Sequence, residues 1–89
     1  MISHTTTRFR TAYQALPETI RRQAHEASRL LRQNPAHPSL RFRQVHPTRP
    51  IYSAHINIQY RALGIRDADT MIWFWIGSHD EYERLLARL

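Results

Sequence analysis

Several residue types that mark particular classes of protein are missing from this sequence. None of the 89 residues is a cysteine, which excludes disulfide cross-links and thiolate metal sites. The longest apolar run, residues 71–76, is far too short to cross a membrane. The first residues also lack the apolar stretch of an export signal. A small domain without cross-links suits a reducing compartment or a fold completed by a partner. We therefore expect a cytoplasmic protein.

Lysine is also absent, so all 13 basic residues are arginines and the formal net charge is +6. Guanidinium groups bind phosphate through paired hydrogen bonds and stack on bases. Such a charge is typical of proteins that bind nucleic acid or an acidic partner, although it also fits a merely soluble cationic surface. The length predicts one domain, residues 1–89, with a small core.

Glycine is scarce, and prolines gather around 35–38 and 47–50, which divides the chain into three blocks. The first block predicts a short strand over 2–6, a helix capped by Thr7 that runs to Ala15, and a second helix from Pro17 to Gln33. Because only a tight break separates the two helices, we expect them to form a helical hairpin.

The second block alternates apolar and polar residues, as half-buried strands do. The alternation predicts strands over 40–45, 52–58 and 60–65, with a turn at 47–50. In the strand over 52–58, one face is expected to carry Tyr52, Ala54, Ile56 and Ile58, and the other Ser53, His55 and Asn57. After a turn at 67–69, the apolar run 70–76 suits a central strand covered on both faces, or a face that binds a partner.

The third block predicts a short closing helix. Ser78 and Glu81 have the spacing of a capping box, and Leu85, Leu86 and Leu89 are expected to face inward. The order β-α-α-β-β-β-α, with strands joined by short turns, predicts the α+β class. We expect a small, mainly antiparallel sheet, with the helical hairpin packed on one face and the helices gathered on that side.

This order and three segments of the chain resemble the RelE/ParE toxin superfamily. The segments are 34–43 (NPAHPSLRFR), 60–64 (YRALG) and 73–82 (WFWIGSHDEY), and the similarity extends over essentially the whole chain. The resemblance implies a RelE-like fold and the role of toxin in a bacterial type II toxin–antitoxin pair. RelE-type members enter the ribosomal A site and cut mRNA, whereas ParE-type members inhibit DNA gyrase without a nuclease site. A cognate antitoxin silences both types.

The resemblance implies catalytic roles for residues on the fourth strand and the closing helix. Arg61 matches the position of a phosphate-binding arginine, although it is also explained as a surface residue paired with Asp67 or Asp69. His79 lies where the family has a catalytic or base-contacting residue, and Tyr82 follows it on one side of the helix. The simpler interpretation is that His79 is a polar residue at the helix start and that Tyr82 packs on the core.

A second group of candidates lies on the polar strand faces. RelE-type enzymes carry two basic residues near Ser53 and His55, so the serine argues against a lysine-based mechanism. A histidine-based one, as in the HigB- and YoeB-like branches, stays open, with His55 as a catalytic residue and Ser53 in the RNA-binding surface. Arg41 and Arg43 alternate with apolar neighbours and form a basic stripe suited to RNA phosphates, or a solvated face.

No metal or cofactor is expected, because the histidines lack ligand spacing and no phosphate-binding glycine loop is present. The residues favour a ribosome-dependent mRNA endonuclease. A ParE-type gyrase inhibitor and a non-toxic binding module of the same fold are the alternatives. Both toxin interpretations imply a hetero-oligomer with an acidic antitoxin segment, and the first also implies binding to the ribosome and mRNA.

Overall fold

The N-terminal block folds as strand β1 (Ile2–Thr5), helix α1 (Thr7–Gln14) and helix α2 (Glu18–Gln33) in a computed structural model that describes residues 1–89. The predicted helical hairpin is thus present. The cap of α1 is Thr6 rather than the expected Thr7, because the Thr6 hydroxyl accepts a hydrogen bond from the Phe9 backbone N–H at 3.1 Å.

The segment after the hairpin differs from the prediction. Residues 40–45 do not form one strand. A turn of 3-10 helix, η1 (Pro38–Leu40), comes first, and only β2 (Arg43–Gln44) is extended. Pro38 starts the 3-10 turn, and Arg41 ends it in the left-handed region at φ 43°. The alternation at 40–43 therefore does not arise from an extended chain.

Three longer strands follow: β3 (Ile51–His55), β4 (Tyr60–Asp67) and β5 (Thr70–Ser78). β3 ends three residues before the predicted limit, because a turn begins at Asn57. The side-chain oxygen of Asn57 accepts hydrogen bonds from the backbone N–H groups of Gln59 and Tyr60. Ile58, expected on the apolar face, lies in this turn and is 85% exposed. The predicted turn between β4 and β5 is present, with Ala68 at φ 54°.

The strands form one sheet in the order β1-β5-β4-β3-β2, in which only the β1–β5 pair is parallel. The middle strand is therefore β4, whereas β5, predicted as central, is second from an edge. The pairing of β4 with β5 skips Phe74, since Leu63 pairs with Trp75 and Gly64 with Trp73. This irregularity turns both Phe74 and Trp75 toward the same apolar cluster.

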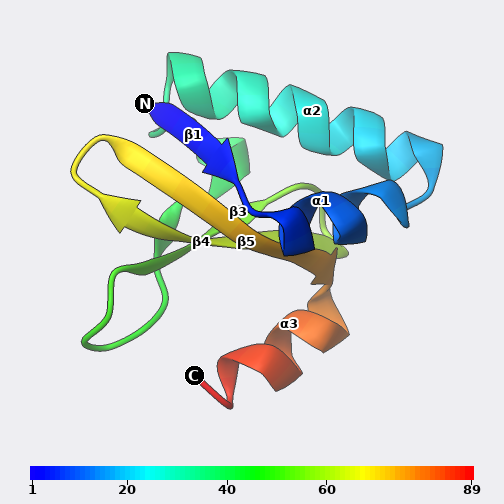
Figure 1. Cartoon of the computed structure of the whole chain (residues 1–89). Helices are drawn as coiled ribbons and strands as arrows, with labels where there is room; N and C mark the ends of the chain where they lie inside the picture. The colour runs from blue at the N-terminus through cyan, green and yellow to red at the C-terminus, as the bar shows by residue number, and fades with distance from the viewer.

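The two faces of the sheet are covered by different helices (Figure 1). Helices α1 and α2 pack on one face, where Ala54, Ala62 and Trp73 belong to the main core. Helix α3 (His79–Leu86) packs on the other face, where Tyr82 joins Ile51 and Leu63. The α+β class and the hairpin on one face are confirmed. The expectation that all helices gather on one side is wrong, because residues of opposite parity along β3 and β4 supply the two clusters, and the irregular pairing of β5 divides its residues between them.

The side chains between α2 and the sheet are small. The contact residues of α2 include Ala24 and Ala27, which face Ala54 and Ala62. Methyl groups fill little space, and a groove of about 420 Å³ remains between the hairpin, β1 and the sheet. Phe9, Tyr13, Leu31, Ile56, Trp73 and Ile76 supply most of its larger apolar side chains.

None of the three helices has the length and apolar character needed to span a membrane.

Candidate nucleic-acid interface

The face of the sheet that carries α3 brings most of the predicted site residues together. His55 on β3 lies directly opposite Arg61 on β4, and Arg43 on β2 lies opposite Ser53 on β3. Directly opposed residues project from the same face of a sheet, with Cβ atoms about 5 Å apart. Strand pairing therefore places His55, Arg61 and Arg43 on the same face of the sheet.

Arg61 is more buried than a surface arginine should be, with 8% of its area exposed. Its Nη1 donates hydrogen bonds to the backbone carbonyls of Asn57 at 2.7 Å and Tyr60 at 3.0 Å. It makes no salt bridge, so the alternative in which Asp67 or Asp69 pairs with it is wrong. Burial lowers the pKa of the Arg61 guanidinium and Arg41 adds to this, whereas Tyr82 and Glu83 favour its charged form.

His55 is half-buried among cations. Its pKa is lowered from 6.5 to about 4, chiefly by burial and then by Arg61, Arg41, Arg43 and His79 in that order. His55 is therefore neutral at pH 7 and surrounded by positive charge.

Two of the predicted residues, Ser53 and Arg41, occupy different environments from those expected, and for Tyr82 the simpler of two interpretations holds. Ser53 is only 2% exposed, so it is part of the sheet interior rather than an accessible RNA contact. Arg41 lies outside the strands, in its left-handed turn, yet it acts on both His55 and Arg61. Tyr82 is 6% exposed, with its ring 6.4 Å from that of Trp75, as the simpler interpretation expected.

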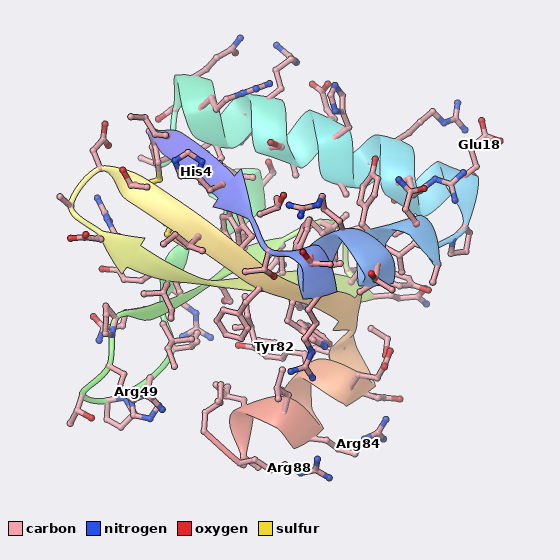
Figure 2. The ribbon with its side chains drawn as sticks, in the orientation of Figure 1. His4, Glu18, Arg49, Tyr82, Arg84 and Arg88 are labelled. Atoms are coloured by element: carbon pink, nitrogen blue, oxygen red, sulfur yellow. The ribbon has the colours of Figure 1, made fainter.

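Helix α3 begins beside this cluster. The capping box is confirmed, since Ser78 accepts from the Glu81 N–H and the Glu81 carboxylate accepts from the Ser78 N–H. The His79 N–H donates to the Gln59 carbonyl at 2.7 Å, which fixes the first turn to the loop before β4. Figure 2 shows Tyr82 directed toward the sheet, with Arg84 and Arg88 directed away from it.

A comparison with protein families identifies the chain. Residues 18–84, about three quarters of it, match the family model of the ParE-like toxin domain. The chain belongs to the ParE-like toxin family. The superfamily suggested by the sequence segments is thereby confirmed.

Solved structures show the same fold as this ParE-like toxin domain at low sequence identity. A chain of the RelB–RelE antitoxin–toxin complex from Methanococcus jannaschii has a TM-score of 0.74 at 12% identity, over 92% of this chain and 96% of that one. YafQ from Escherichia coli has a TM-score of 0.72 at 9% identity, over 90% and 94%. The YoeB/ParE toxin from Agrobacterium tumefaciens has 0.69 at 12%, over 89% and 99%. No curated protein matched the sequence.

Three residues that the sequence analysis did not select support the site of this ParE-like toxin domain. Asn57 forms the turn that presents its carbonyl to Arg61. Glu83 lies 3.3 Å from Nε2 of His79, and its i, i+4 spacing was visible in the sequence. Gly77 pairs with Arg61, and a Cβ there would lie 2.6 Å from the Trp75 ring. Apart from the glycine itself, nothing in the sequence indicates that the Trp75 ring lies against Gly77.

The chemistry available to the ParE-like toxin on this face is proton transfer next to a bound anion. His55 supplies a neutral imidazole, and Arg41, Arg43 and Arg61 supply positive charge without a carboxylate salt bridge. His79 adds a second imidazole, which is half-exposed. No three histidine or carboxylate residues come together as metal ligands.

Proposed function

We propose that this ParE-like toxin is a ribosome-dependent mRNA endonuclease that blocks translation and is neutralised by a cognate antitoxin. The observation that carries the proposal is the direct pairing of His55 with Arg61 across β3 and β4, with His79 hydrogen-bonded through its backbone to Gln59 just before β4. A gyrase inhibitor needs a binding surface but has no need of paired proton-transfer groups beside an anion site.

The proposed reaction uses the 2′-hydroxyl of the RNA as nucleophile. His55 takes the proton of that hydroxyl, and the 2′-oxygen then forms a bond to phosphorus. The bond from phosphorus to the 5′-oxygen breaks, leaving a cyclic phosphate, and His79 gives a proton to the departing oxygen. Arg61, with Arg41 and Arg43, stabilises the negative charge on the phosphorus oxygens. Tyr82, buried on α3, favours the charged form of Arg61 by raising its pKa.

A pKa of about 4 makes His55 a weak base in the free protein. A phosphodiester bound among the arginines would offset their charge, and the pKa of His55 would then rise toward its ordinary value near 6.5. The site would thus gain basicity only when substrate is present. This coupling would allow a histidine beside three arginines to serve as a base.

An antitoxin is proposed as the partner because several chains of the same fold come from RelB–RelE complexes. The net charge of +6 favours an acidic antitoxin segment that folds on binding. The groove beside the hairpin, lined by apolar side chains with Arg10 and Arg32, offers such a segment both kinds of contact. Binding to ribosome and mRNA is proposed for the basic face of the sheet.

The first test is macromolecular synthesis after brief induction in a bacterial host. Incorporation of labelled methionine and labelled thymidine is followed in the same culture. We expect protein synthesis to fall first, while DNA synthesis continues. An early fall in DNA synthesis with protein synthesis intact would refute the nuclease proposal.

Variants then locate the activity. His79→Gln and His55→Gln should each abolish translation arrest, because each removes a proton-transfer group while keeping the side-chain volume close. His37→Gln is the matched control, since the His37 side chain caps η1 and is not among the groups that shift the pKa of His55 or of Arg61. Arg61→Gln should also abolish activity. Because Arg61 is buried, the thermal melting of the Arg61→Gln variant is measured as well, to separate loss of activity from loss of folding. Arg66→Gln on the same strand is the control.

Inhibition of DNA gyrase is the second candidate function. The observation that favours it is the family model itself, which describes a ParE-like toxin domain. In that case His55→Gln and His79→Gln would leave toxicity unchanged, and supercoiling by purified gyrase would fall when the wild-type chain is added.

A further inference from the structure

Helix α3 is short and depends on its contacts at both ends. It has eight residues, fewer than an isolated helix needs for stability in water. Its start is fixed by the capping box and by the bond from His79 to Gln59. The apolar residues that continue toward its end, Leu85, Leu86 and Leu89, are only half-buried against the second cluster.

One polar contact joins the chain just after α3 to a distant loop. Nε2 of His46, which follows β2, lies 3.0 Å from the backbone carbonyl oxygen of Leu89. The two residues are 43 positions apart. His46 is half-buried, so this contact is partly shielded from water.

The other ring nitrogen determines which atom carries the proton. Nδ1 of His46 accepts hydrogen bonds from the backbone N–H groups of Thr48 at 3.2 Å and Arg49 at 3.0 Å. A nitrogen that accepts two hydrogen bonds carries no proton, so the neutral ring has its proton on Nε2. Nε2 therefore donates to the Leu89 carbonyl. One side chain thus shapes the 46–50 loop and binds the end of the helical segment.

We propose that His46 is a positioning residue that holds α3 against the sheet and so keeps His79 beside His55 and Arg61. Backbone hydrogen bonds from Arg88 to Leu85 and from Leu89 to Leu86 connect this contact to the last turn of α3. The consequence for activity rests on the proposed function, whereas the contact of His46 with Leu89 does not. The loop with Arg49 lies on the α3 side of the sheet (Figure 2).

The chain contains its own comparison for this role. His37 also precedes a proline, and its Nδ1 accepts the N–H of the residue two positions later, Ser39, at 3.2 Å. No contact links His37 to α3; its other partner is the Ser39 hydroxyl. His37 therefore has the local role of His46 without the long-range one.

Two substitutions separate these roles. His46→Asn keeps an acceptor oxygen near the position of Nδ1, so the loop turn persists, but the shorter side chain does not reach Leu89. His46→Gln is long enough to donate from its Nε2 to the Leu89 carbonyl. His37→Asn is the control for replacing a loop histidine that precedes proline.

The readout is amide hydrogen exchange of residues 83–87 in the purified chain, together with translation arrest in cells. Loss of one hydrogen bond should speed exchange in His46→Asn by roughly three- to tenfold, and His46→Gln should restore protection. Translation arrest should weaken in His46→Asn and return in His46→Gln. His37→Asn should match wild type in both.

Each outcome bears on the proposal. Unchanged α3 exchange in His46→Asn would overturn it. Faster exchange with full translation arrest would overturn the positioning role, since α3 would have loosened without cost to activity. If wild type does not arrest translation, the proposed function fails. The exchange of α3 amides would still decide whether His46 holds the helix.

Discussion

The low pKa of His55 leads to a sharp prediction about how stability depends on pH. The perturbation is a change from pH 7 to pH 4, applied to wild type and to His55→Gln. In the folded chain the pKa of His55 is about 4, whereas in the unfolded chain it is near 6.5. Between these values the unfolded chain binds more protons, so the free energy of unfolding falls as the pH falls.

The size of the effect follows from the difference between the two pKa values. Each pKa unit corresponds to about 1.4 kcal/mol, so the depression from 6.5 to about 4 sets an upper limit of about 3.5 kcal/mol, which solvent screening of the partly exposed imidazole reduces. This contribution is fully present above pH 6.5 and is lost progressively down to about pH 4. For a small domain it is a large share of the total stability.

The assay is urea unfolding followed by tryptophan fluorescence at half-unit steps from pH 4 to pH 8. Other groups titrate in this range, so the informative quantity is the difference between wild type and His55→Gln. We expect that difference to move by about 2–3 kcal/mol in favour of the variant as the pH falls. Parallel stability curves would refute the conclusion that His55 is held neutral.

Salt provides an internal check on the cause. Burial is the largest contribution to the low pKa of His55, and the charges of Arg61, Arg41 and Arg43 follow. High salt screens the charges but leaves the imidazole half-buried. An NMR titration of the His55 ring in 0.5 M sodium chloride should therefore show a partial rise of its pKa. A full return to 6.5 would mean that charge, and not burial, dominates.

Three further predictions concern packing and helix termination. Gly77→Ala should cost about 1–3 kcal/mol of stability and shift tryptophan fluorescence, because its Cβ would press against the Trp75 ring; an unchanged melt would show that the ring moves freely. Ala27→Leu should raise the melting temperature through a gain of about 1 kcal/mol, since it fills the groove beside the hairpin, and a lower melting temperature would mean that the groove is too narrow for it. Ser78→Ala should cost about 1 kcal/mol by removing the cap of α3, with Ser78→Asp restoring it; calorimetry of both variants measures this.

The helices could be predicted because their signals are local. The spacing of Ala24, Ala27 and Leu31 specifies the buried side of α2, and the capping box at Ser78 specifies the start of α3. The segment around Arg41 could not be predicted in this way. Its alternation fits a strand. The 3-10 turn that starts at Pro38 and the left-handed conformation of Arg41 instead depend on the burial of Leu40 in the main core.

The site could be predicted only in part, for a related reason. Alternation along β3 and β4 places His55 and Arg61 on one face, because a period of two is a property of the strand itself. The degree of burial is a property of what covers that face. Ser53 was expected in the RNA-binding surface but is 2% exposed, and of the two interpretations of Tyr82 the structure bears out packing on the core. Which side α3 packs on is decided by tertiary contacts alone.

The two covered faces of this sheet determine which amino-acid substitutions each position of its strands tolerates. In β3, Ala54 faces the helical hairpin, whereas His55 faces the arginines on the other side of the sheet. In β4, Ala62 faces the hairpin and Arg61 faces the side that carries His55. Each of these two pairs thus combines a residue constrained by packing with one constrained by charge, whereas Ile51 and Leu63 on the second face belong to an apolar cluster. A saturation library read for both protein abundance and toxicity should show loss patterns that alternate along these strands. An evolving chain could therefore retune its target on one face while its core on the other face stays fixed.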